Sequence, residues 1–159
     1  KTPLARKWQI LVPNNDSRYQ LRRKGFGVTA TNTPELIWKT EYSQVNGSLP
    51  YNDMLNYNFG STPGRGGVKP IRSQDAMVFI RTEVNVSSAG TAEMLFDSPK
   101  GLTLWVDEIP TEVAPAIKLD LSPGVHRISL AVNLSERGPH PLKIMLGETS
   151  AQLQFVNGK

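Results

Sequence analysis

Apolar and polar residues alternate along most of the second half of the chain. The clearest apolar triplets at alternate positions are Leu102, Leu104 and Val106, and Ile128, Leu130 and Val132. Successive side chains of a β-strand point to opposite faces of its sheet, so each triplet shares one face. The pattern predicts half-buried strands that pack on a common core.

Runs of this kind follow one another between Ala76 and Phe155, with turn residues between them. The predicted strands cover 76–86, 91–97, 101–107, 117–121, 125–134, 141–147 and 151–156. Turns containing Pro and Gly separate several of them, because Pro fixes φ and Gly accepts positive φ. This half of the chain therefore predicts a succession of antiparallel strands.

The N-terminal part, 1–75, is less regular. The segment 8–12 predicts a first strand that stops at Pro13, 25–28 a short extended piece, and 36–42 either a strand or a helical turn that starts at Thr33. Residues 45–50 predict a turn into an extended segment, and 50–74 a long loop, which in a compact domain is often functional.

Together these segments predict an all-β protein: an antiparallel, jelly-roll-like β-sandwich of about nine or ten strands. The 159 residues fit a single domain, 1–159, that is large enough to bury a core, and no domain boundary is visible. Regular strands are expected over 76–156. No apolar run is long enough for a membrane span.

Composition narrows the possible chemistry. The chain has no cysteine, which excludes disulfides, thiolate metal sites and a cysteine nucleophile. Its net charge of +4 includes a basic cluster at Arg18, Arg22, Arg23 and Lys24. Because few aromatic residues interleave with this cluster, we interpret it as a solvated loop and expect no nucleic-acid partner.

Catalytic and metal-binding patterns are scarce. The two histidines, His126 and His140, lack the spacing of metal ligands, and His126 is expected to point outward from a strand. No sequence pattern brings two carboxylates into one cleft, as a glycosidase would need. Asp97, Asp107 and Asp120 lie near predicted strand ends, where a rim of oxygen atoms can hold Ca²⁺. Capping of strand ends is the alternative for these residues. We therefore expect no catalytic residues and no cofactor, with calcium left possible.

The aromatic residues offer the best candidate ligand site. Trp8 and Trp105 lie among aliphatic residues in predicted strands and are expected in the core. Aromatic rings outside the regular strands can stack on the apolar face of a sugar, and a nearby arginine can donate to hydroxyl groups. The candidate ligand-binding residues are Trp38, Tyr42, Tyr51, Tyr57, Phe59 and Arg65. The same aromatic residues could instead plug one end of the sandwich.

The segments 101–107, 119–121 and 123–132, together with 45–50 and 8–11, resemble the strands of galactose-binding-like and lectin-like β-sandwiches. More narrowly, the chain resembles a module of large exported bacterial proteins that also carry a haem-binding CxxCH cytochrome-type domain or a dehydrogenase-like domain. The chain itself has no CxxCH, and Glu108 stands where glycine is common in the resembling sequences. The resemblance implies an extracytoplasmic, non-catalytic module.

We therefore expect an accessory domain that is not an enzyme and binds carbohydrate or another polar ligand through loops at one end. The alternative is a structural domain that docks to neighbouring domains of a larger exported protein and binds no small molecule. An independent hydrolase is a third hypothesis, which the missing catalytic spacing disfavours. Periplasmic or secreted localisation follows from the resemblance.

Overall fold

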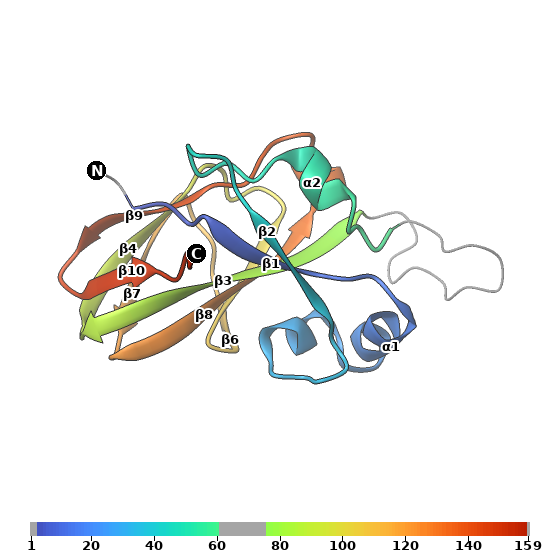
Figure 1. Cartoon of the computed structure of the whole chain (residues 1–159), viewed down its shortest axis with the longest axis horizontal. Helices are drawn as coiled ribbons and strands as arrows, with labels where there is room; N and C mark the ends of the chain where they lie inside the picture. Colours follow the sequence, from blue (N-terminus) through green and yellow to red (C-terminus); the bar gives the residue numbers. More distant parts are fainter. Residues whose placement is uncertain (1–2, 61–75, 159) are drawn as a thin grey trace.

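The computed structural model describes residues 3–60 and 76–158, and these form two antiparallel sheets (Figure 1). The larger sheet has seven strands in the order β2-β1-β3-β8-β5-β6, with β10 also paired to β3, and the smaller has the order β7-β4-β9. The strands are β1 Lys7–Leu11, β2 Trp38–Tyr42, β3 Met77–Ser88, β4 Gly90–Phe96, β5 Leu102–Val106, β6 Ile109–Thr111, β7 Ala116–Leu121, β8 Gly124–Asn133, β9 Ile144–Thr149 and β10 Gln152–Phe155. The predicted antiparallel β-sandwich is confirmed.

The main core lies between the two sheets. Each long strand contributes alternate residues to it, as the sequence pattern predicts; β3 contributes Val78, Ile80, Val84 and Val86. Strand β5 also faces the core with the predicted residues Leu102, Leu104 and Val106, and Leu104 is only 1% exposed. Trp8 on β1 is fully buried in this core. Burial of these apolar side chains is the main stabilising contribution to the sandwich.

A second apolar cluster covers part of the opposite, outer face of the large sheet. Met77 and Phe79, which alternate with the inner residues of β3, pack there with Trp105 of β5. The cover comes from α1 (Asn15–Lys24) and the 3₁₀ helix η1 (Phe26–Ala30), which lie below the strands in Figure 1. The rest of this outer face carries polar side chains and is the setting of the candidate site.

Helix α1 corrects the interpretation of its segment as a solvated loop. Asn14 caps the helix by accepting a hydrogen bond from the Ser17 backbone, and the Ser17 hydroxyl accepts one from Asn14 in return. Leu21 is buried against the sheet, and Gly25 ends the helix with a positive φ of 84°. The prediction of an extended piece over 25–28 was also wrong, since η1 occupies it.

Strand β6 was not predicted. It pairs with β5 through a two-residue loop, Asp107–Glu108, in which both residues have positive φ, 49° and 72°. Glycine or asparagine usually fills such positions. Here the Asp107 side chain fixes the turn, because its carboxylate accepts hydrogen bonds from the backbone N–H of Arg127 and from His126.

Two short helices complete the described chain. Helix α2 (Tyr51–Leu55) lies at the top of Figure 1 and places Met54 in the main core, and α3 (Leu134–Arg137) follows β8. Within the described residues, no helix is both long and apolar enough to cross a membrane.

Candidate binding site on the outer sheet face

The structure does not bring the predicted ligand-binding residues into one platform. Strand β2 is an edge strand of the large sheet. Trp38 and Tyr42 lie four residues apart on it, so their side chains share its outer face. Tyr42 is 49% exposed, and Trp38 is half-buried beside the outer apolar cluster. Arg65 lies outside the described residues.

The other predicted aromatics face the opposite way. Tyr51 and Tyr57 are half-buried and pack against the main core. The Tyr57 hydroxyl donates to Glu41 Oε2 at 2.7 Å, and burial together with this carboxylate raises the pKa of Tyr57 to about 12. Glu41 alternates with Trp38 and Tyr42 along β2, so this contact lies on the inner side of the strand.

Phe59 is a core residue, and its assignment to an exposed platform is corrected. Its side chain is 1% exposed in the outer apolar cluster, where its ring meets Phe79 edge-on at 5.4 Å between centroids. A buried ring cannot stack on a ligand. Of the predicted site residues that are described, Trp38 and Tyr42 keep exposed surface on the outer face.

Arg81, which the sequence analysis did not single out, completes a site around Trp38. Its guanidinium lies 3.9 Å from the centroid of the Trp38 ring, and its Nε donates to Gln9 Oε1 at 2.9 Å. The antiparallel register places Gln9 opposite Arg81. These two contacts hold the long arginine side chain in one orientation before any ligand arrives.

Arg81 lines two hollows on the outer face. The larger, here called the outer hollow, has a volume of about 260 Å³ and is lined by residues 31–34, Leu36, Trp38 and Arg81. The smaller has a volume of about 60 Å³, and Lys7, Gln9 and Glu83 are among the residues that line it. Arg81 therefore belongs to the wall of both hollows.

Arg127 of β8 fixes the far wall of the outer hollow. Its Nη1 donates to the Ala30 carbonyl at 3.0 Å, and its Nη2 donates to Asn32 Oδ1. The side chain thus ties the segment after η1 to the sheet. Burial, followed by the positive charge of Arg127, lowers the pKa of Arg81 to about 10, while Glu83 acts in the opposite direction.

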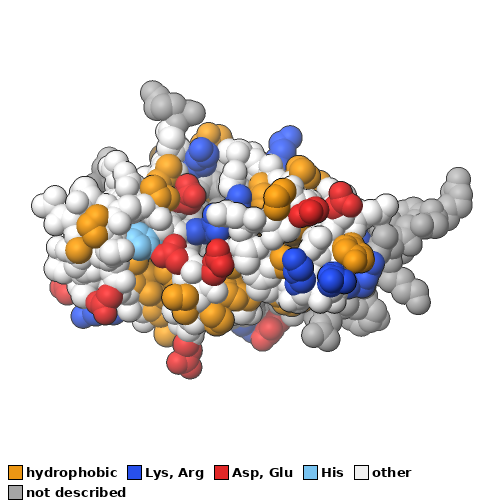
Figure 2. Space-filling model, turned by 90° about the horizontal axis from the view of Figure 1, so that it is seen from below, with side chains coloured by type: hydrophobic (Ala, Val, Ile, Leu, Met, Phe, Trp, Pro, Cys, Tyr) orange, Lys and Arg blue, Asp and Glu red, His pale blue; other side chains and the backbone are white. Residues whose placement is uncertain are grey.

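Figure 2 turns the fold so that the side carrying α1 faces the viewer. Basic side chains gather there toward the right, over the end of the molecule where α1 lies. Three residues at the end of this helix, Arg22, Arg23 and Lys24, are exposed. Acidic and basic side chains lie next to each other over the middle of the same view.

His126 differs from its predicted outward orientation. Its side chain is 12% exposed, Nδ1 bonds to Asp107 Oδ2, and Nε2 lies 2.6 Å from the Ser122 carbonyl oxygen. Both partners are acceptors, so the imidazole is held in its doubly protonated form. Burial alone lowers the pKa of His126, but the two hydrogen bonds and the Asp107 charge outweigh it and raise the pKa.

Two of the three carboxylates predicted at strand ends form ion pairs within the domain. Asp97 pairs with Arg137, Asp107 pairs with His126, and Asp120 is exposed on β7. Within 3–60 and 76–158, no three acidic or histidine side chains gather as metal ligands would. A calcium site at the strand ends stays a prediction.

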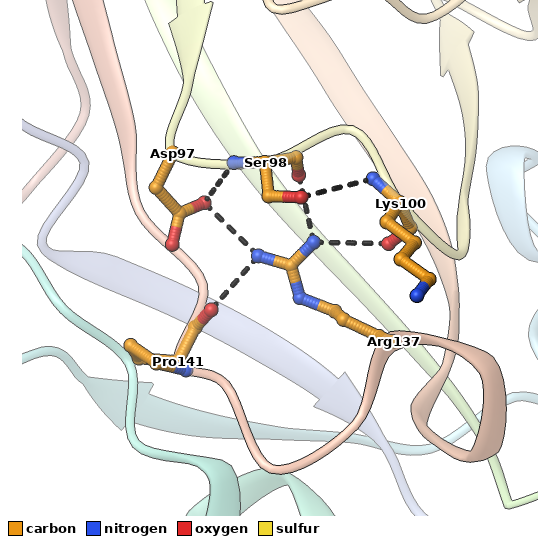
Figure 3. Close-up of polar contacts among 5 residues, drawn as sticks. All are labelled: Asp97, Ser98, Lys100, Arg137 and Pro141. Carbon is orange, nitrogen blue, oxygen red and sulfur yellow. Dashed lines mark hydrogen bonds and ion pairs between the residues drawn. The ribbon is translucent and has the colours of Figure 1, made fainter.

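Arg137 donates four hydrogen bonds at the sandwich end where β4 leads into β5 (Figure 3). Its Nη1 donates to the carbonyls of Ser98 at 2.7 Å and Lys100 at 3.0 Å. Its Nη2 donates to Asp97 Oδ1 at 3.0 Å and to the Pro141 carbonyl at 2.8 Å. The side chain is 0% exposed, so its role is to join loops, not to contact a ligand.

No family model and no curated protein matches the chain. Among solved structures, the chain is similar to a β-glucuronidase from an uncultured Clostridium species, with a TM-score of 0.45 and 12% sequence identity. The likeness covers 92% of this chain and 28% of that enzyme, so the chain spans a little over a quarter of the enzyme's length. At this TM-score the likeness carries no argument about activity or ligand.

Proposed function

We propose that this domain is a non-catalytic module that binds carbohydrate in the outer hollow. The observation that carries the proposal is the stack of Arg81 on Trp38 at the wall of that hollow. An aromatic ring offers apolar contact to the C–H groups of a sugar, and a planar guanidinium offers several fixed donors to its hydroxyl groups.

The rest of the wall suits the same class of ligand. Thr31, Asn32 and Thr33 supply hydroxyl and amide groups, while Pro34 and Leu36 supply apolar surface. Small-ligand sites combine such apolar walls with a few placed polar groups. The volume of about 260 Å³ lies near the lower end of ligand sites, which favours one sugar unit of a chain over an enclosed oligosaccharide.

The proposed site differs from the one expected from the sequence, where loops at one end of the sandwich would bind the ligand. It lies on a sheet face, and its polar groups come from β3 and the segment that precedes β2. Extracytoplasmic localisation and a place in a larger exported bacterial protein stay predictions from the resemblance.

A second candidate function is docking to neighbouring domains of a parent chain. Burial of Phe59 and the inward packing of Tyr51 and Tyr57 favour it, since they remove three of the five aromatic residues of the predicted platform.

Affinity electrophoresis in gels that contain neutral and acidic polysaccharides separates the two candidates. Carbohydrate binding predicts that at least one polysaccharide retards the protein and that Trp38→Ala weakens this by about 10-fold or more. Tyr19→Ala is the matched control, because Tyr19 is 51% exposed on α1 and away from the hollow. Failure of every polysaccharide to retard the folded protein would leave the docking function in its place.

A further inference from the structure

Two arginines meet on the outer face without a carboxylate bound to either. Among the described residues, the ion pairs are His126 with Asp107 and Arg137 with Asp97. Arg81 and Arg127 form none, although both are half-buried. Charged groups taken partly out of water normally find an opposite charge.

The sheet register brings the two guanidinium groups onto neighbouring positions. Arg81 on β3 pairs with Ser129 on β8, and Arg127 pairs with Glu83, so the arginines are diagonal neighbours on one face. Glu83 supplies one negative charge nearby, while Lys7 adds a further positive charge to the wall of the smaller hollow. The balance of these side chains is positive.

Arg81 also has unused donors. Its Nε is bonded to Gln9, but its two terminal amino groups have no hydrogen-bond partner among the described residues. Gln9 and the Trp38 ring already fix the plane of the guanidinium. A guanidinium held this way presents two parallel N–H groups, which match the oxygen atoms of a carboxylate or sulfate.

The Ser129 hydroxyl adds a second unsatisfied group on the same face. It lies opposite Arg81 in the register, is 2% exposed, and has no hydrogen-bond partner among the described residues. Buried polar atoms are rarely left unpaired in a native fold. The Ser129 oxygen is buried and does not line the outer hollow, so it marks a polar position under Arg81 and is not itself a ligand contact.

We infer that the outer hollow selects an acidic saccharide, a sugar that carries a carboxylate or sulfate group bound by Arg81. This inference rests on the proposed function and names its substrate class. The anionic group sits against the terminal amino groups of Arg81, with Arg127 adding its charge from the neighbouring strand. The sugar ring lies against the part of Trp38 that Arg81 leaves uncovered and against the segment 31–34.

Dextran, carboxymethyl dextran and dextran sulfate test this with one polymer backbone in three charge states. We expect carboxymethyl dextran or dextran sulfate to retard the protein far more than dextran, and the stronger of the two identifies the anionic group. Arg81→Gln should weaken this binding by about 10-fold or more, because a charge-assisted bidentate contact is lost.

Arg22→Gln is the matched control, since it removes the same charge from an exposed position on α1. Equal losses in Arg81→Gln and Arg22→Gln would overturn the inference, because they would show non-specific attraction to a basic protein. Arg81→Lys keeps the charge but loses the two parallel N–H donors of the guanidinium, so it should also bind more weakly than the parent. Thermal unfolding of each variant checks that it is folded.

Three further outcomes separate this inference from the proposed function. Retardation by a neutral polysaccharide that depends on Trp38 and not on Arg81 would overturn the acidic ligand and leave carbohydrate binding in place. Tighter binding to single-stranded DNA than to either acidic dextran, lost in Arg81→Gln, would assign the site to a phosphate polymer. Absence of retardation by any polysaccharide would contradict the proposed function itself.

Discussion

Arg137 and Arg81 show two opposite ways in which this sandwich holds a positive charge. Arg137 is fully buried, and four hydrogen bonds to Asp97 and to three backbone carbonyls surround it. Among the described residues, Arg81 has one hydrogen-bond partner, Gln9, a stacked Trp38 ring and no carboxylate. The first is a closed structural contact, and the second leaves donors facing a hollow. The difference supports a structural role for Arg137 and the ligand-binding role that we propose for Arg81.

Arg137→Met gives the largest expected effect. The change leaves Asp97 and the three carbonyls without their donor, so the free energy of unfolding should fall by about 3–5 kcal/mol. Urea denaturation measures this loss. Arg137→Lys is the control, because it keeps the charge and loses part of the hydrogen bonding. A loss below about 1 kcal/mol for Arg137→Met would show that the cluster is not a structural contact.

Arg81→Met should change the free energy of unfolding by less than about 1 kcal/mol. The lost hydrogen bond to Gln9 and the lost ring contact are each worth about 1–2 kcal/mol. Relief of the repulsion from Arg127 and of the cost of burial offsets them. Urea denaturation beside Arg137→Met makes the comparison direct. Equal destabilisation by the two variants would remove the distinction between the arginines.

His126 gives the smallest effect, a dependence of stability on pH. Its pKa in the folded protein is raised above the ordinary value of 6.5. The doubly protonated ring therefore stabilises the fold fully below that value, and this stabilisation is lost as the pH rises through the folded-state pKa.

We expect the difference in unfolding free energy between the parent and His126→Gln to be larger at pH 6 than at pH 9. Paired urea titrations at the two pH values measure it. A larger difference at pH 9 would contradict a raised pKa. The mutation also loosens Asp107, whose turn has positive φ, so a constant loss at both pH values adds to the pH-dependent one.

The alternation of apolar residues predicted the sandwich well, because that pattern depends on neighbours in sequence. Leu104 and Val132 are buried on the faces where the period of two places them. Helix α1 was missed although its start was readable: Asn14 and Ser17 have the spacing of a capping pair. The apolar face of α1 is narrow, with Leu21 as its buried aliphatic residue, so periodicity gave little signal.

The candidate site could be predicted only in part. Trp38 was named as a candidate because it is an aromatic residue. Arg81 was not named, because a single arginine in an alternating strand pattern is typical of any exposed strand position. Its role depends on Gln9 and Trp38, which two strands far away in sequence place beside it. Phe59 shows the reverse error, since an aromatic residue near a predicted loop is here buried against Phe79. Both cases depend on packing between distant segments, which local pattern does not contain.

Nitrogen-15 NMR of the arginine Nε–H and tryptophan Nε1–H groups tests the central claim most directly, during a titration with carboxymethyl dextran. The account predicts that the signals of Arg81 and Trp38 shift while the signal of Arg137 does not. Shifts at Arg137 without shifts at Arg81 and Trp38, or saturating binding with no shift at either of these two residues, would contradict it.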